Sequence, residues 1–66
     1  MSFGRKMLEF RARHNLTQAQ LAKIVGIAIN TVQRLENEIN KPTKRNSIKI
    51  ENKMKEWEEK QNVVQM

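Results

Sequence analysis

Residues 17–36 read TQAQLAKIVGIAINTVQRLE, and they predict two short helices joined by a tight turn. Thr17 followed by Gln20 forms a capping box, in which the hydroxyl accepts from the backbone at Gln20 and the glutamine side chain reaches back. Gly26 adopts the positive φ of a tight turn without steric cost. The rest of the chain is expected to hold the second of these helices in place.

That second helix has one apolar face and one unusual polar face. Its inward set begins at Ile27 and continues with Val32 and Leu35. Its outward residues are Ile29, Asn30, Thr31, Gln33 and Arg34. Such side chains are indifferent helix formers, and an exposed isoleucine serves no purpose on an isolated domain. Asn and Gln can bond adenine, Arg can bond guanine or phosphate, and Ile can contact a thymine methyl group, which favours a helix in the DNA major groove.

Length and composition exclude several classes of protein. The 66 residues form one domain with a small core, expected to supply about 3–5 kcal/mol of net stability. The chain has no cysteine, so neither disulfides nor a cysteine-ligated zinc site can stabilise it. No apolar run approaches the roughly 18 residues of a membrane span, and no signal-peptide pattern begins the chain. We therefore expect a soluble cytoplasmic protein.

The charge of the chain is strongly basic and unevenly distributed. Thirteen Lys and Arg against seven Asp and Glu give a net charge of +6. Residues 1–34 carry six basic side chains and one acidic, whereas residues 56–66 carry one basic and three acidic. A basic body of this size favours a polyanionic partner, although charge alone is weak evidence because many small basic proteins bind nothing specific.

A first helix is predicted over about residues 3–13. Ser2 can cap its start, and Asn15 can end it, because asparagine tolerates the left-handed conformation of a helix terminus. Its apolar stripe consists of Phe3, Met7 and Phe10.

One long helix is predicted after the loop 38–42. Pro42 prevents a continuous helix, Thr43 is a candidate cap, and residues 44–60 contain neither Gly nor Pro. Its expected apolar stripe consists of Ser47, Ile48, Ile50, Met54 and Trp57. Residues 61–66 are predicted to be a frayed tail, with a short segment of a dimer interface as the alternative.

The charges of this last helix oppose its dipole, each at a cost of about 0.3–1 kcal/mol at low salt. Lys44 and Arg45 lie at its positive N-terminal end, where a nearby phosphate would explain them. The acidic residues near its C-terminal end can face an antiparallel second copy, or they form a solvated surface. The pairs available for such a contact are Lys49 or Lys53 with Glu56 or Glu59.

The chain resembles the phage Cro and lysogenic-repressor helix-turn-helix family, which includes many xenobiotic-response-element-type regulators. The matching motifs are FGxxMxxFR at 3–11, LTQxxLA at 16–22, GI at 26–27, VxxLEN at 32–37 and PT at 42–43. The resemblance covers about residues 3–54. It implies an all-α, lambda-repressor-like domain of four helices, here with a long C-terminal helix, which forms one domain over residues 1–66.

The resemblance also implies which residues contact DNA. Gln18 would contact a phosphate and often a base. The remaining base-reading positions are Ile29, Asn30 and Gln33, and Thr31 and Arg34 would contact the DNA backbone or flanking bases. Independently of the resemblance, the basic residues Lys41, Lys44 and Arg45 are expected to contact the DNA backbone. Arg11 and Glu36 match a pair that forms a partly buried ion pair between the first and third helices.

Three positions depart from the family pattern. Ala28 replaces the usual Ser or Thr cap of the third helix, which forfeits about 1 kcal/mol. Glu38 stands where glycine is common, so Asn37 or Asn40 is expected to take any left-handed conformation in that turn. Glu51 occupies a position that is usually small and apolar, which leaves the packing register of the last helix open.

Catalytic and metal-binding patterns are absent from the sequence. His14 is the only histidine, has no ligand-type neighbour at metal-binding spacing, and is expected to be an exposed helix end or a phosphate neighbour. The chain has no Asp, no glycine-rich phosphate loop and no nucleophile motif. We expect no enzyme activity, no cofactor, no metal and no small-molecule ligand.

The leading hypothesis is a sequence-specific double-stranded DNA-binding regulator, a phage Cro-like repressor that occupies its operator as a homodimer in the bacterial host cell, on the nucleoid. One alternative is a protein-interaction module, an antitoxin or a modulator of a phage repressor, which uses the same fold. Its docking surface would consist of Leu8, Ile29, Met54 and Trp57. Nonspecific nucleoid or RNA binding fits the charge, but it does not fit the base-sized polar side chains.

Overall fold

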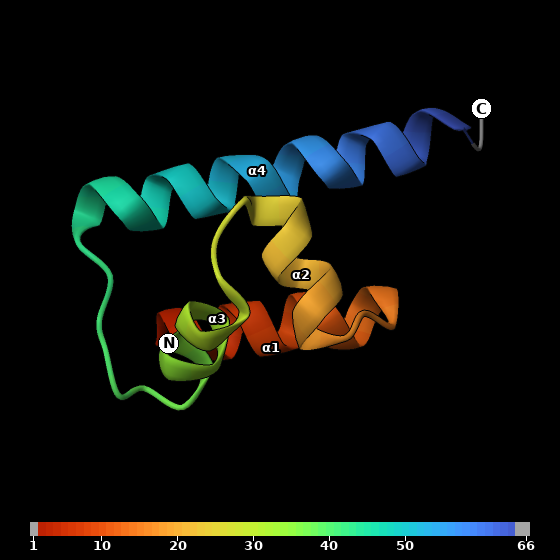
Figure 1. Ribbon diagram of the computed structural model, residues 1–66. Helices are drawn as coiled ribbons and strands as arrows, with labels where there is room; N and C mark the ends of the chain where they lie inside the picture. Colours follow the sequence, from red (N-terminus) through yellow and green to blue (C-terminus); the bar gives the residue numbers. More distant parts are fainter. Residues whose placement is uncertain (1, 65–66) are drawn as a thin grey trace.

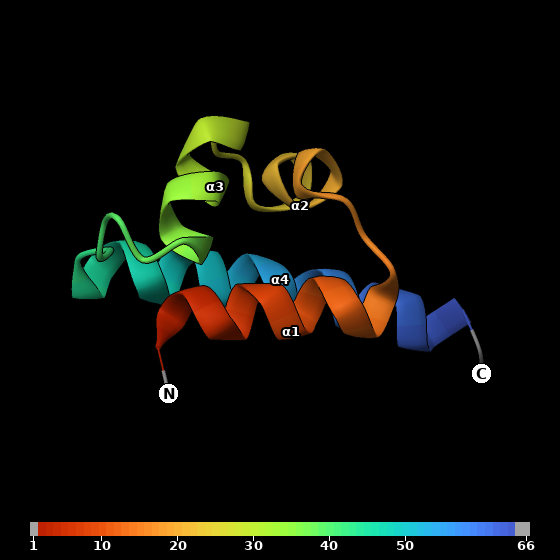
Figure 2. The same ribbon diagram turned by 90° about the horizontal axis from the view of Figure 1, so that it is seen from below.

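The computed structural model describes residues 2–64 and, within them, the side chains of residues 2–61. This part of the chain forms four helices and no strand, which confirms the predicted all-α fold. The helices are α1 (Phe3–His14), α2 (Gln18–Val25), α3 (Ile29–Glu36) and α4 (Lys44–Val64). Figure 1 shows α1 and α4 running in the same direction, with α2 between them. Figure 2 shows α2 and α3 on one side of both long helices.

The caps of α1 are those that the sequence predicts. The Ser2 Oγ accepts a hydrogen bond of 3.2 Å from the Arg5 backbone N–H, and α1 ends one residue later than expected, at His14. Asn15 has φ 55°, ψ 48°, the left-handed conformation. The N–H of the next residue, Leu16, donates a hydrogen bond of 2.9 Å to the Arg11 carbonyl. Local chemistry therefore sets both ends of α1.

The capping box and the glycine turn are also confirmed. The Gln20 N–H donates to Thr17 Oγ1 at 3.1 Å, and the Thr17 N–H donates to Gln20 Oε1 at 2.9 Å. Gly26 has φ 72°, and the Ile27 N–H bonds the Ala22 carbonyl at 3.1 Å. These bonds end α2, and α3 begins after a short turn, at Ile29.

The turn after α3 differs from expectation, because Glu38 itself is left-handed, with φ 61°. Asn37 keeps φ −84°, and its N–H still bonds the Gln33 carbonyl at 3.0 Å. The Ile39 N–H then reaches back to the Arg34 carbonyl at 2.9 Å, which completes a Schellman motif. In that motif the residue after the cap must have positive φ, so the expectation of a left-handed Asn37 or Asn40 was wrong.

A single helix follows Pro42, as predicted, and it is longer than predicted. Thr43 Oγ1 accepts from the Asn46 N–H at 3.2 Å, which caps its start. The helix continues to Val64, so residues 61–64 are helical rather than a frayed tail. The remainder of the predicted tail, residues 65–66, lies outside the described residues.

The core is shared by all four helices. Its buried members are Met7, Phe10, Leu21, Ala22, Val25, Val32, Leu35, Ile50 and Met54, and half-buried Phe3, Leu16, Ile24, Ile27 and Trp57 pack against them. Ile48 was wrongly assigned to the stripe of α4: it is 48% exposed, because two residues of helix turn it well away from Ile50. Glu51 fits the register at an intermediate depth, and its carboxylate receives a bond of 3.0 Å from Lys6 Nζ.

Candidate nucleic-acid interface

The outward face of α3 is exposed as the sequence predicts. The helix packs through Val32 and Leu35, which are buried. The residues left in solvent are Ile29, Asn30, Thr31, Gln33 and Arg34. Ile29 remains 41% exposed, although it is a large apolar residue. No side chain caps the start of α3, since the cap position is Ala28. The orientation of this face is therefore confirmed, and its contacts with DNA stay predictions.

An ion pair joins α3 to α1. Arg11 Nε lies 2.7 Å from Glu36 Oε2, and Arg11 Nη2 lies 2.9 Å from Glu36 Oε1. Arg11 Nη1 also donates to the Leu16 carbonyl at 3.3 Å. Glu36 is 6% exposed, so this is the partly buried pair that the resemblance implies. The paired guanidinium and carboxylate fix the orientation of α3 relative to α1, and loss of one partner leaves a buried charge.

Gln18 is tied into the same pair. Its Nε2 donates to Glu36 Oε1 at 2.9 Å, and the residue is half-buried at the first position of α2. Glu36 therefore connects the start of α2 to α1 and α3. Nothing in the sequence pattern indicated this bond, because the two residues lie 18 positions apart.

His14 does not lie where the sequence suggested. It is half-buried between two aromatic rings, with its centroid 4.9 Å from that of Phe10 and 4.9 Å from that of Trp57. Its Nε2 lies 2.7 Å from Glu58 Oε2, which also pairs with Arg13 Nη2 at 3.2 Å. The expectation of an exposed helix end or a phosphate neighbour was wrong, because α4 extends far enough to cover the end of α1.

Ion pairs divide the basic residues into two groups. Every basic side chain of α1 has a carboxylate partner: Arg5 with Glu9, Lys6 with Glu51, Arg11 with Glu36, and Arg13 with Glu58. The basic residues without an ion-pair partner within the described part of the chain are Lys23, Arg34, Lys41, Lys44, Arg45, Lys49, Lys53, Lys55 and Lys60. Six of these nine residues lie on α4, whereas α2, α3 and the loop after α3 carry one each, so the unpaired positive charge is concentrated on α4.

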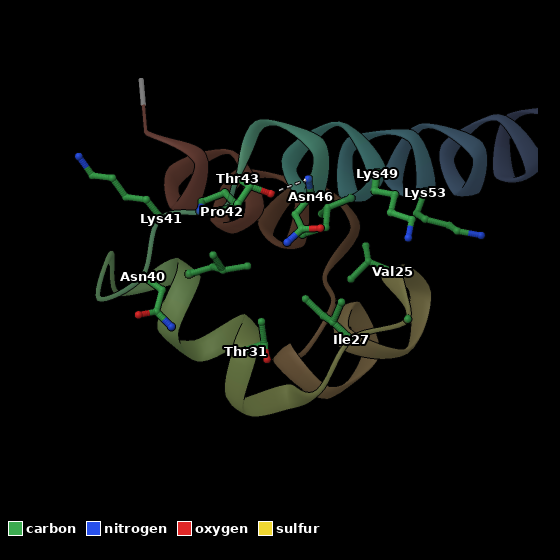
Figure 3. A pocket seen from close by; sticks show the side chains of 13 residues that line it. Val25, Ile27, Thr31, Asn40, Lys41, Pro42, Thr43, Asn46, Lys49 and Lys53 are labelled. Carbon is green, nitrogen blue, oxygen red and sulfur yellow. Dashed lines mark hydrogen bonds between the residues drawn. The ribbon is translucent and has the colours of Figure 1, made fainter.

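A groove of about 510 Å³ adjoins α3 on the side that faces α4 (Figure 3). Thr31 and Leu35 line it from α3, and three lysines, Lys41, Lys49 and Lys53, line it from the loop and α4. No carboxylate is among its lining residues. Thr31 therefore borders this positively charged groove rather than the centre of the outward face of α3.

Other kinds of site are not found in the described residues. They contain no group of three or more His, Cys, Asp or Glu side chains that could hold a metal ion. None of the helices in this part of the chain is long and apolar enough to cross a membrane.

A protein-family model described as Helix-turn-helix matches residues 7–56, which include all of α2 and α3. The chain belongs to this family, of the Cro and CI type. Helix-turn-helix proteins of this type are DNA-binding transcription regulators, and the family is generally non-enzymatic. No curated protein and no solved structure matches the chain.

The helix-turn-helix arrangement brings some predicted site residues together and separates others. Base-reading candidates Ile29, Asn30 and Gln33 share the exposed surface of α3. The backbone-contacting candidates Lys41, Lys44 and Arg45 are exposed in the loop and the first turn of α4. The docking surface of the alternative hypothesis is wrong at two positions: Met54 is buried in the core, and Trp57 is half-buried against it.

Proposed function

We propose that this helix-turn-helix protein is a sequence-specific, double-stranded DNA-binding transcriptional regulator, a Cro-like repressor of phage type that occupies its operator as a dimer in a bacterial host cell. The observation that carries the proposal is the exposed face of α3, where base-sized polar side chains surround an exposed Ile29. A lone domain gains nothing from such a surface, whereas a major groove matches it in both chemistry and size.

The roles on α3 follow from side-chain chemistry. Asn30 and Gln33 each offer an N–H donor and a carbonyl acceptor on one carboxamide. These two groups complement the N7 acceptor and the N6–H donor that adenine presents in the major groove. Ile29 offers an apolar contact to a thymine methyl group. Gln18, at the start of α2, is bonded to Glu36 at the buried C-terminal end of α3, and its remaining groups contact a phosphate or the edge of the site.

The unpaired cations supply the contacts that do not depend on sequence. Lys41, Lys44 and Arg45 bind phosphates on one side of α3, since none of the three has an ion-pair partner among the described residues. Thr31 and Arg34, on α3 itself, bind the part of the DNA backbone that lies closest to this helix. A phosphate near the first turn of α4 also offsets the unfavourable placement of Lys44 and Arg45 at the positive end of the helix dipole.

A dimer allows the repressor to bind both half-sites of an operator. Two copies would place two α3 helices in successive major grooves, roughly 34 Å apart, on a palindromic operator. The α4 helices provide the contact, because Glu56 and Glu59 have no ion-pair partner among the described residues and can face Lys49 or Lys53 of a second copy. Bound in this way, the protein blocks RNA polymerase by occupancy.

Selection of bound sequences from random duplexes by the purified protein tests this proposal. The expected result is a palindrome whose half-sites are separated by about one helical turn. If each copy neutralises three or four phosphates, log K should fall against log[salt] with a slope of about −5 to −7. Recovery of no preferred sequence, or a flat dependence on salt, would contradict the proposal.

A further inference from the structure

Glu36 is a buried charge that serves two partners from different helices. Its Oε1 accepts from Arg11 Nη2 at 2.9 Å and from Gln18 Nε2 at 2.9 Å, and its Oε2 accepts from Arg11 Nε at 2.7 Å. Its side chain is 2% exposed. Because the ion pair with Arg11 already holds the Glu36 carboxylate and compensates its charge, the main effect of the hydrogen bond from Gln18 is to order the glutamine side chain.

The polarity of the Gln18 carboxamide follows from this arrangement. An ionised carboxylate can only accept hydrogen bonds, so the group that faces Glu36 must be the amide nitrogen and not the oxygen. One of its two N–H groups is then engaged. The Gln18 oxygen has no donor among the described residues. The free groups that Gln18 can offer to DNA are therefore one acceptor and one donor in a fixed order.

We propose that Glu36 is a positioning residue for DNA recognition: it presets the carboxamide of Gln18, while it is itself too buried to touch DNA. The proposal rests on the proposed function of the α3 surface and names a residue behind that surface. A free glutamine samples many combinations of its three side-chain dihedral angles, and DNA binding must select one of them. When Glu36 selects the conformation in the folded protein, less conformational entropy is lost on binding.

Gln33 provides a matched comparison within the same protein. It is exposed on α3, and its side chain forms no hydrogen bond with any described residue. Its carboxamide becomes ordered only on DNA. The two glutamines should therefore differ in the free protein and become alike in the complex.

Nuclear magnetic resonance relaxation of the side-chain NH₂ groups tests this difference in the free wild-type protein. We expect the Gln18 carboxamide to be ordered and to show nuclear Overhauser contacts to Arg11, whereas the Gln33 carboxamide is mobile. Glu36→Gln should mobilise the first group and leave the second unchanged. Equal mobility of Gln18 and Gln33 in the wild type would overturn the proposal, even if the Glu36→Gln variant does not fold.

A double-mutant cycle on the selected operator tests the consequence for binding. The variants are Glu36→Gln, Gln18→Ala and the double variant, all measured below the unfolding temperature of the least stable. Glu36→Gln should weaken operator binding about two- to twelvefold more in the wild-type background than beside Gln18→Ala, the range expected for ordering one such side chain. A merely structural Glu36 would instead shift α3 and weaken binding equally in both backgrounds, and equal losses overturn the proposal.

These outcomes are distinguishable from failure of the proposed function. If the wild-type protein selects no sequence, the DNA-binding proposal fails and the role of Glu36 in recognition fails with it. If the wild type selects an operator and the cycle shows no coupling between the two positions, only the inference about Glu36 fails.

Discussion

Gly4 in α1 lies directly against the backbone carbonyl of Leu35 in α3, and a β-carbon at Gly4 would lie far closer to that oxygen than van der Waals contact allows. It would also crowd the backbone of Glu36. The atoms that it would meet are backbone atoms, so they cannot move aside as the end of a flexible side chain could. The close approach of α1 and α3 therefore requires glycine at this position.

Gly4→Ala should destabilise the protein by about 1–3 kcal/mol, the usual cost of overpacking. Helix propensity alone predicts the opposite sign, because alanine is favoured over glycine by about 1 kcal/mol within a helix. Urea denaturation followed by circular dichroism decides between the two effects. A variant as stable as the wild type would show that α1 and α3 can separate without cost.

Glu38→Gly should stabilise the protein. Glu38 has φ 61°, a conformation that costs a side-chain-bearing residue roughly 1–2 kcal/mol and that glycine adopts freely. Glycine loses more backbone entropy on folding, so the expected net gain is about 0.5–1 kcal/mol. Glu38→Ala is the control, because it removes the same carboxylate and retains the strain. A gain for the alanine variant equal to that of glycine would locate the effect in charge rather than conformation.

Glu58→Gln should weaken the contact between α1 and α4, whereas Glu59→Gln should not. Glu58 is half-buried and bonded to both His14 and Arg13, while the adjacent Glu59 is exposed. The expected loss is about 1 kcal/mol at Glu58 and less than about 0.5 kcal/mol at Glu59. The single tryptophan, Trp57, packs edge-on against the His14 ring, so its fluorescence should report the loosened contact. Similar melting curves for the two variants would contradict the assigned contacts.

Gln33→Ala and Lys44→Ala should affect DNA binding in different ways. Gln33→Ala should cost about 1–3 kcal/mol at one base pair of the operator and relax the choice of base there. Lys44→Ala should weaken binding to operator and random DNA alike and lower the salt slope by about one unit per copy. Fluorescence anisotropy on both DNAs measures the difference. Identical effects on the two DNAs would contradict the division of roles.

Much of the fold could be predicted because its signals are local. The Thr17 and Gln20 side chains cap a helix within three residues of each other, and Gly26 and Pro42 each act on their own backbone. These interactions do not depend on how the segment packs against the rest of the protein, so the helices and their first residues follow from the local sequence alone. The outward face of α3 follows as well, since the periodicity of its apolar residues decides which side packs.

The neighbours of the site depended on the tertiary structure. His14 meets Glu58 across 44 residues, and Gln18 meets Glu36 across 18, so neither contact has a signal in local spacing. The first contact depends on the path of α4, and the second depends on the angle between α2 and α3. The packing of the whole core decides both. The left-handed Glu38 has a different, local cause: the Schellman bonds from Glu38 and Ile39 to the last turn of α3 set the end of the helix, whatever the intrinsic tolerance of the residue at that position.

The amino-acid sequence by itself determined the helices, their caps, the positive charge and the identity of the side chains that α3 exposes. Only the tertiary structure decided which of the charges remain unpaired and which polar side chains are held in place by a neighbour. The reason is physical: hydrogen bonds and turns act over a few residues, whereas burial and ion pairing depend on which helices pack together.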